Sequence, residues 1–133
     1  MLLSRLYFIL ILFALIIPAK AQECGYIYVS PGGANTGVTG TKANPASFDY
    51  GISLLSATDS IIKLSEGTYY LNQTLNLPSN AIIEGGFDST SWIKNNQTPS
   101  ILYRTNQNIL SNPSRLVAVE GNNSTHIKLM DLT

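Results

Sequence analysis

The residues that could perform chemistry in this 133-residue chain are few and scattered. Two of the eight acidic residues, Glu66 and Glu84, lie at the ends of short apolar segments. If these segments stack, the two carboxylates could lie close together and form an acid/base or Ca²⁺-binding site. The alternative is two solvated residues at strand ends. Arg104 and Arg115 are interpreted as ordinary surface residues, and His126 is the only histidine, which excludes a histidine-based triad. We therefore predict no catalytic residue, no metal site and no cofactor in this chain.

Aromatic side chains form the second group of candidates, because a flat ring can stack on the apolar face of a pyranose. Trp92, Tyr70 and Tyr103 are the candidate carbohydrate-binding residues, with Tyr69 as a further member of the platform. The alternative is structural: Tyr69 or Tyr70 packs inward, and Trp92 fixes residues 88–96 against the rest of the fold. Asp88 precedes three hydroxyl-bearing or turn-forming residues and is expected to shape a turn.

Short apolar segments separated by turn residues must position these side chains. The predicted strands are 26–29, 61–64, 66–70, 75–77, 81–84, 101–103, 116–119 and 127–130. Segments 61–64, 81–84 and 101–103 lie about twenty residues apart, a spacing typical of coils that stack into a solenoid. The expected inward column contains Ile62, Leu64, Leu77 and Ile83.

Glycine marks the places where such a chain must turn sharply. Gly67, Gly85 and Gly86 are the predicted structural turns, with positive φ angles that glycine tolerates best. Asn80 is expected to take the same left-handed conformation.

A short helix is predicted between the first and second strands. Asn44 is the expected N-cap and Pro45 the first helical residue, and Phe48, Ile52 and Leu55 then fall on one face of about three turns. The helix is expected to end near residue 57. Its weak point is Gly51, which should cost about 1 kcal/mol relative to alanine.

The first 21 residues have the pattern of a cleavable signal peptide. Arg5 precedes an unbroken apolar run over residues 6–17, which is shorter than a typical membrane-spanning helix. Ala19-Lys20-Ala21 matches the small-x-small pattern that signal peptidase cleaves. Loss of Arg5 and Lys20 leaves six basic against eight acidic residues, a net charge of −2. We therefore expect a secreted or outer-membrane surface location, no stable membrane span after cleavage and no nucleic-acid partner. Cys24 is the only cysteine, so no internal disulfide can form.

The ordered set of Tyr28-Val29-Ser30, Gly40-Thr41, residues 61–69 with Glu66-Gly67-Thr68-Tyr69, and residues 82–87 resembles the N-terminal segment of secreted parallel β-helix proteins. The chain looks particularly like large bacterial surface proteins of Bacteroidetes type. The resemblance implies an all-β, right-handed parallel β-helix of the pectin-lyase-like fold. In this scheme residues 22–58 are the N-terminal strand, loop and capping helix, and residues 59–133 are the first coils.

The resemblance implies a scaffold and not an activity. The leading interpretation is a non-catalytic cap segment, adhesin-like or carbohydrate-contacting, whose partner is a polysaccharide or cell-surface glycan. One alternative is the opening of a polysaccharide lyase or glycoside hydrolase whose catalytic residues lie beyond Thr133, and another is a small autonomous binding module. The chain is expected to be a truncated member, incomplete at its C-terminus, and its uncovered strands would then associate edge to edge.

Overall fold

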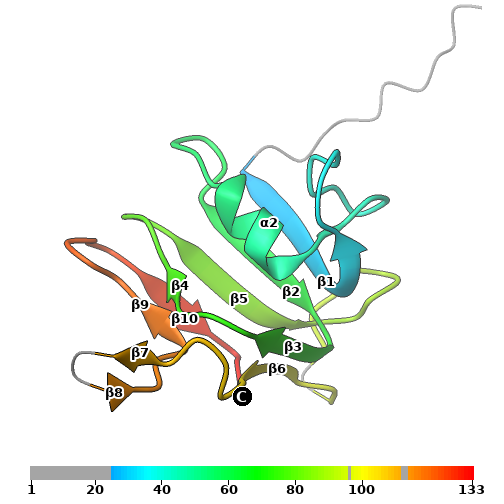
Figure 1. Ribbon diagram of the computed structural model, residues 1–133. Helices are drawn as coiled ribbons and strands as arrows, with labels where there is room; N and C mark the ends of the chain where they lie inside the picture. Colours follow the sequence, from blue (N-terminus) through cyan, green and yellow to red (C-terminus); the bar gives the residue numbers. More distant parts are fainter. Residues whose placement is uncertain (1–24, 96, 112–113) are drawn as a thin grey trace, which may run out of the picture.

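Strands dominate the fold, which a computed structural model describes for residues 25–95, 97–111 and 114–133 (Figure 1). The single helix of these residues is α2 (Phe48–Ser53). The strands are β1 (Tyr26–Ala34), β2 (Ile61–Ser65), β3 (Gly67–Leu71), β4 (Leu75–Asn76), β5 (Ile82–Phe87), β6 (Ser100–Arg104), β7 (Leu110–Ser111), β8 (Ser114–Arg115), β9 (Val119–Glu120) and β10 (Lys128–Met130). The protein therefore belongs to the sheet-rich, all-β class. The expected signal peptide and Cys24 lie outside the described residues.

Four strands form one parallel sheet in the order β1-β2-β5-β10. Its register aligns Ile27, Ile62, Ile83 and Leu129 in one column. Because residues paired across neighbouring strands lie on the same face of a sheet, the whole column lies on one face. Ile27, Ile62 and Ile83 have relative exposures of 2%, 0% and 0%, so the expected inward positions of Ile62 and Ile83 are confirmed.

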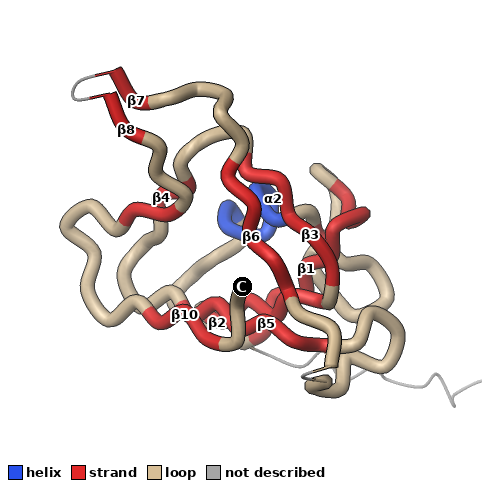
Figure 2. The backbone as a smooth tube through the Cα atoms, turned by 90° about the horizontal axis from the view of Figure 1, so that it is seen from below, coloured by secondary structure: helices blue, strands red, loops and turns tan. Residues whose placement is uncertain are grey.

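Two further parallel sheets pair β3 with β6 and β4 with β9, whereas β7 and β8 form an antiparallel hairpin. Successive strands visit the three parallel sheets in rotation. After β2 the chain enters the second sheet at β3 and the third at β4, and it returns to the first at β5. Beyond β6 and the hairpin, it reaches the third sheet at β9 and the first at β10. Figure 2 shows the four-stranded sheet and the β3–β6 pair on different sides of the interior.

One apolar core fills the space between these sheets. Leu64 from β2 and Leu77 after β4 are buried there, as predicted, together with Leu71 and Leu75. Phe48 enters the same core from α2. Burying an aliphatic side chain of this size contributes about 1.5–3 kcal/mol, so these inward residues are the main source of stability.

The helix packs against β1 but begins later than the sequence pattern indicates. Ser47, not Asn44, is the N-cap, and its hydroxyl accepts a backbone N–H from the first turn at 3.4 Å. Pro45 is instead held along β1, because its carbonyl accepts the Ala34 N–H at 3.1 Å. Ala46 is fully buried and bridges to the same strand. Pairing with β1 thus takes the residues that the pattern assigned to the first turn, and α2 has only six residues.

The predicted twenty-residue period holds for one step only. Ile61 of β2 pairs with Ile82 of β5, as expected, but β6 pairs with β3 and not with β5. The next strand of the four-stranded sheet is β10, where Lys128 pairs with Ile82. Residues 88–95 and 97–99 and the β7–β8 pair lengthen the path between these strands, so the intervals between paired strands differ in length.

The two edges of the four-stranded sheet differ. The β1 edge is packed against α2, whereas β10 lies at the far edge (Figure 1). Leu129 and Met130 of β10 have relative exposures of 48% and 37%. Beyond β10, the chain turns to the β3–β6 sheet, where the Leu102 N–H donates to the Thr133 carbonyl at 2.9 Å. The inward column is therefore covered at its β1 end and exposed at Leu129.

Candidate functional site

Two of the predicted sugar-binding residues lie side by side on the outer face of the β3–β6 sheet. The register places Tyr70 opposite Tyr103, with ring centroids 5.6 Å apart and ring planes at 68°. Their relative exposures are 68% and 55%. Aromatic pairs favour this edge-to-face geometry, which here leaves ring surface available to a ligand.

The third predicted residue, Trp92, lies in a different cluster. Its ring packs on Tyr28 with centroids 4.8 Å apart, Phe87 completes the cluster, and only 6% of Trp92 is exposed. The indole N–H donates to the Lys42 carbonyl at 3.3 Å. Trp92 therefore fixes its loop against the sheet, in agreement with the structural alternative, and the structure does not bring it to Tyr70.

Asp88 organises the turn that carries Trp92. Its Oδ1 accepts the backbone N–H groups of Thr90 and Ser91 at 3.0 and 2.6 Å. These hydrogen bonds stabilise the carboxylate and lower the pKa of Asp88 below its ordinary value, the Ser91 N–H contributing most. The turn leaves Trp92 with a φ of 56°, which is uncommon for a bulky residue. Asp88 is thus a turn-forming residue, as its sequence context predicts.

The three predicted turn glycines have different roles. Gly67 takes a φ of 122° where the chain passes from β2 to β3. Gly85 and Gly86 lie inside β5, where the pairing of Lys63 with Glu84 shifts before the next pair. Such a shift is a β-bulge, which inserts an extra residue into one strand and bends it.

At this bulge the two glycines are required for different reasons. Gly86 has a φ of 81°, whereas Gly85 does not have the expected positive φ. A Cβ on Gly85 would lie 2.5 Å from the Asp131 carbonyl and 2.8 Å from the Ser100 Cβ. Close packing by the chain after β10, and not a turn, therefore explains the glycine at position 85.

A buried polar network links the corners of the β2–β3 and β5–β6 segments. The Ser100 hydroxyl donates to the Ser65 carbonyl at 2.8 Å and accepts the Gly86 N–H at 2.9 Å. The Tyr69 hydroxyl lies within hydrogen-bond distance of the carbonyls of Ser65 and Val29, at 2.9 and 3.1 Å. Burial raises the pKa of Tyr69, and its hydrogen bonds with Ser65 offset only part of this effect. The network consequently holds a neutral Tyr69 in the core, and sequence periodicity gave no signal for Ser65 or Ser100.

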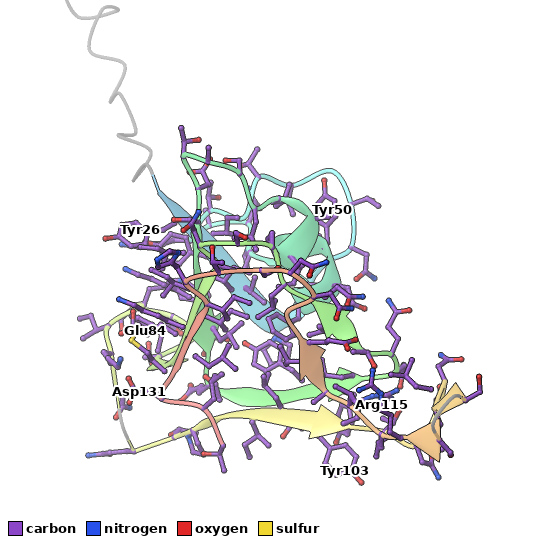
Figure 3. The ribbon with its side chains drawn as sticks, turned by 90° about the vertical axis from the view of Figure 1, so that its left-hand side faces the viewer. Tyr26, Tyr50, Glu84, Tyr103, Arg115 and Asp131 are labelled. Carbon is purple, nitrogen blue, oxygen red and sulfur yellow. The ribbon has the colours of Figure 1, made fainter. Side chains whose placement is uncertain are left out.

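Glu66 and Glu84, the candidate acid pair, have different partners. Glu84 and Asp131 both form ion pairs with Lys94, which lies between them, and Figure 3 shows the two acids on the same side of the molecule. Partial burial acts to lower the pKa of Lys94, but the hydrogen bonds that its ammonium donates to Asp131 and Glu84 raise the pKa overall. Glu66 instead accepts the Ser89 hydroxyl at 3.3 Å. This arrangement ties residues 94 and 131 to β5, and it places Glu84 and Asp131, not Glu66, around one ammonium group.

Arg104 has a structural role that the sequence does not reveal. Its guanidinium donates to the carbonyls of Val117, Leu71 and Asn108 at 2.9, 3.0 and 3.1 Å. The fork of five N–H donors thereby joins the end of β3 to the segment before β9. Arg115, by contrast, pairs with Glu120 at the exposed surface.

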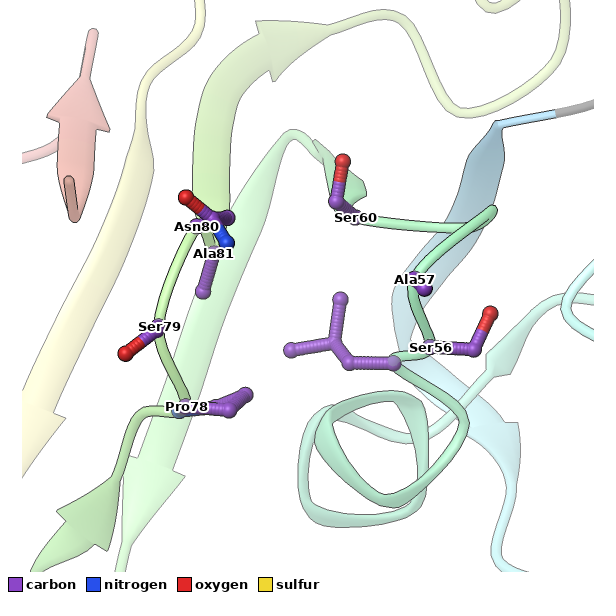
Figure 4. A pocket seen from close by; sticks show the side chains of 8 residues that line it. Ser56, Ala57, Ser60, Pro78, Ser79, Asn80 and Ala81 are labelled. Carbon is purple, nitrogen blue, oxygen red and sulfur yellow. The ribbon is translucent and has the colours of Figure 1, made fainter. Parts of the chain in front are cut away.

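Two cavities are lined by residues that the structure describes. The larger, of about 520 Å³, lies between residues 55–60 and the turn at Pro78–Ala81, and its polar lining consists of serines and Asn80 (Figure 4). The smaller, of about 220 Å³, lies beside β3 and is lined by the exposed Tyr70 together with Asn35 and Asp49. The smaller cavity alone combines an exposed ring with a charged group, so it is the better candidate binding site.

Two features, clustered metal-ligating side chains and membrane-spanning helices, are absent from the part of the chain that the structure describes. Residues 25–95, 97–111 and 114–133 contain no group of three or more metal-ligating side chains. In the same residues, no helix has the length and apolar character needed to cross a membrane. Comparison with protein families, with curated proteins and with solved structures finds nothing that matches this chain.

Proposed function

We propose that this chain is the N-terminal cap and first coils of a secreted or cell-surface β-helix that acts as a non-catalytic scaffold. The proposed fold is the right-handed, pectin-lyase-like parallel β-helix of bacterial surface proteins. Support comes from the rotation of successive strands through three parallel sheets, which is the path of a coiling chain. Right-handedness follows the preference of nearly all crossovers between parallel strands.

The observation that carries this proposal is the column of Ile27, Ile62, Ile83 and Leu129. Exposure along it is 2%, 0%, 0% and 48%, so each inward residue is covered until the last. A further coil stacked about 4.8 Å beyond β10 would cover Leu129 and pair the free edge of the strand. The scaffold interpretation therefore assigns β10 as the surface on which the next coil stacks.

The non-catalytic assignment rests on what the acidic residues do. Glu84 and Asp131 are paired with Lys94, Glu120 with Arg115, and Asp88 with its own turn. Each of these carboxylates has a structural partner. The alternative of a polysaccharide lyase or glycoside hydrolase places the catalytic acids and bases in coils beyond residue 133, and it predicts a face rich in Asp and Lys or Arg there.

Sedimentation equilibrium of the secreted chain, residues 22–133, tests the proposal. At about 10–100 μM we expect self-association, because an uncovered strand edge and an apolar column end favour it. Leu129→Lys should give a monomer, since an associated edge would bury the new charge without a partner. The matched control is Ile93→Lys, which adds the same charge at a residue that is 69% exposed and outside the column, and it should leave association unchanged.

A stable monomer that unfolds in one cooperative transition would overturn the proposal in favour of a small autonomous module. Equal loss of association in both lysine variants would also count against it, because general charge and not the β10 edge would then control assembly.

A further inference from the structure

The smaller cavity lies on the side of β3 that faces away from β6. Its lining includes Ser30 and Asn35 from the β1 region, Asp49 from α2 and Tyr70 from β3, with no residue of β6. At about 220 Å³ it is smaller than the roughly 300–1,000 Å³ of pockets that enclose drug-sized ligands. The volume therefore suits one ring-sized unit of a longer ligand.

The backbone of β3 contributes hydrogen-bonding groups on this side. The Gly67 N–H donates to the Pro99 carbonyl, and the Leu71 carbonyl accepts the Thr105 N–H, so alternate residues from 67 to 71 face β6. In a parallel strand the intervening residues direct their N–H and C=O groups the opposite way. Thr68 and Tyr70 consequently present backbone donors and acceptors on the side where the cavity lies.

Charge restricts what the cavity can accept. Asp49 is exposed in the first turn of α2 and is the only carboxylate in the lining, which contains no lysine or arginine. A carboxylate accepts hydrogen bonds from hydroxyl groups but repels another anion. Neutral hydroxylated ligands should therefore bind better than uronic acids.

Aromatic surface extends the site beyond the cavity. Tyr70 borders it with a ring that is 68% exposed, and Tyr103 continues the aromatic surface at a ring separation of 5.6 Å. A ring face can stack on the C–H groups of a pyranose while its hydroxyls bond to the polar lining. An exposed ring pair next to a polar cavity is thus suited to a chain of sugars.

We propose that the cavity and the Tyr70–Tyr103 pair bind a neutral hexopyranose polysaccharide, with one sugar in the cavity and the next units over the tyrosines. This inference rests on the proposed scaffold function, to which it adds a ligand class and a location. A protein strand that pairs with β3 is the competing occupant. The sugar is favoured because only Thr68 and Tyr70 expose backbone groups there, which is a short edge for strand addition.

Isothermal titration calorimetry of the secreted chain should test this with linear hexaoses of β-1,4-glucose, β-1,4-mannose and β-1,3-glucose, and with hexagalacturonate. We expect binding of at least one neutral hexaose and weaker binding of hexagalacturonate. Tyr70→Ala should weaken the neutral complex at least about tenfold, because the stacking ring is lost. Tyr70→Phe keeps the ring and should bind within about twofold of the wild type.

Asp49→Asn should reduce the ratio of the affinity for a neutral hexaose to the affinity for hexagalacturonate. The inference is overturned if none of the neutral hexaoses binds a chain that is folded by circular dichroism, or if Tyr70→Ala binds as well as the wild type. It is also overturned if an extended Thr-Val hexapeptide, and no hexaose, protects the amides of Thr68 and Tyr70 from hydrogen exchange.

These outcomes are separable from the test of the scaffold. Leu129→Lys lies at the opposite end of the coil stack and should abolish association while leaving sugar affinity unchanged. Conversely, loss of sugar binding in Tyr70→Ala should leave sedimentation unchanged. Each proposal can therefore fail without the other.

Discussion

Replacing Gly51 by alanine separates helix propensity from packing, because the two predict opposite effects. Within a helix, alanine is favoured over glycine by about 0.5–1 kcal/mol. In the structure, however, a Cβ on Gly51 would lie 2.5 Å from the Val29 Cγ2. Val29 is completely buried and its β-branched side chain has few alternative rotamers, so it cannot easily move aside.

Overpacking of a core costs about 1–3 kcal/mol, which exceeds the helical gain. We therefore expect Gly51→Ala to lower the free energy of unfolding by about 1 kcal/mol. Val29→Ala removes the obstructing methyl groups at a cost of about 2 kcal/mol. In that background the added methyl at position 51 fills part of the void, and Gly51→Ala should stabilise by about 0.5–1 kcal/mol. The coupling energy of this double-mutant cycle should be about 1–3 kcal/mol.

Urea unfolding followed by Trp92 fluorescence provides the measurement, since Trp92 is the only tryptophan and is buried. The Leu129→Lys background should keep the chain monomeric. Gly32→Ala is the control, because a Cβ there would meet nothing within 4 Å. The packing argument would be refuted if Gly51→Ala stabilises the protein that retains Val29. It would also be refuted by a coupling energy between positions 51 and 29 below about 0.3 kcal/mol.

Three further predictions concern the polar interior. Ser100→Ala leaves the Gly86 N–H without its acceptor and should cost about 1–3 kcal/mol in urea unfolding, whereas Ser89→Ala at the surface should cost less than about 0.5 kcal/mol. Burial raises the pKa of Tyr69 in the folded state above its unfolded-state value of 10. The contribution of Tyr69 to the free energy of unfolding is therefore complete below pH 10, and it falls by about 1.4 kcal/mol per pH unit as the pH rises above 10. Tyr69→Phe should lack that component, and an identical alkaline slope in both proteins would contradict the assignment. Arg104→Lys keeps the charge but loses the fork of donors, so it should lower the free energy of unfolding by about 1–3 kcal/mol and speed hydrogen exchange in residues 105–111 and 114–118. Unchanged exchange in these residues would argue against the role of the guanidinium.

The sequence predicts the inward residues well because their signal is local. In β2, Ile62 and Leu64 are buried whereas Ile61 and Lys63 are less so, and this two-residue period is set by strand geometry; only Ser65, which is also buried, departs from it. Tyr69 shows the limit of the same signal. Its pattern allows either Tyr69 or Tyr70 to face inward, and the hydrogen bonds of its hydroxyl with Ser65 and Val29 accompany the inward position of Tyr69.

The errors in the prediction arise where a distant segment overrides a local preference. Asn44 and Pro45 form a plausible helix start in isolation, but pairing of the next residues with β1 moves the cap to Ser47. The partner of β6 depends on the lengths of intervening loops, which local pattern does not encode. Gly85 illustrates the same limit, because its glycine is required by the carbonyl of Asp131, 46 residues away.

The candidate sugar site and the proposed stacking surface occupy opposite ends of the same set of parallel strands. The cavity lies beside β1 and α2, at the covered end, whereas Leu129 marks the exposed end. Coils added beyond β10 would lengthen the scaffold without covering Tyr70. The proposed scaffold would then present the cavity near its N-terminal end. A bound glycan and additional coils would therefore occupy different surfaces. This separation is the physical reason that the two proposals are compatible in one short chain.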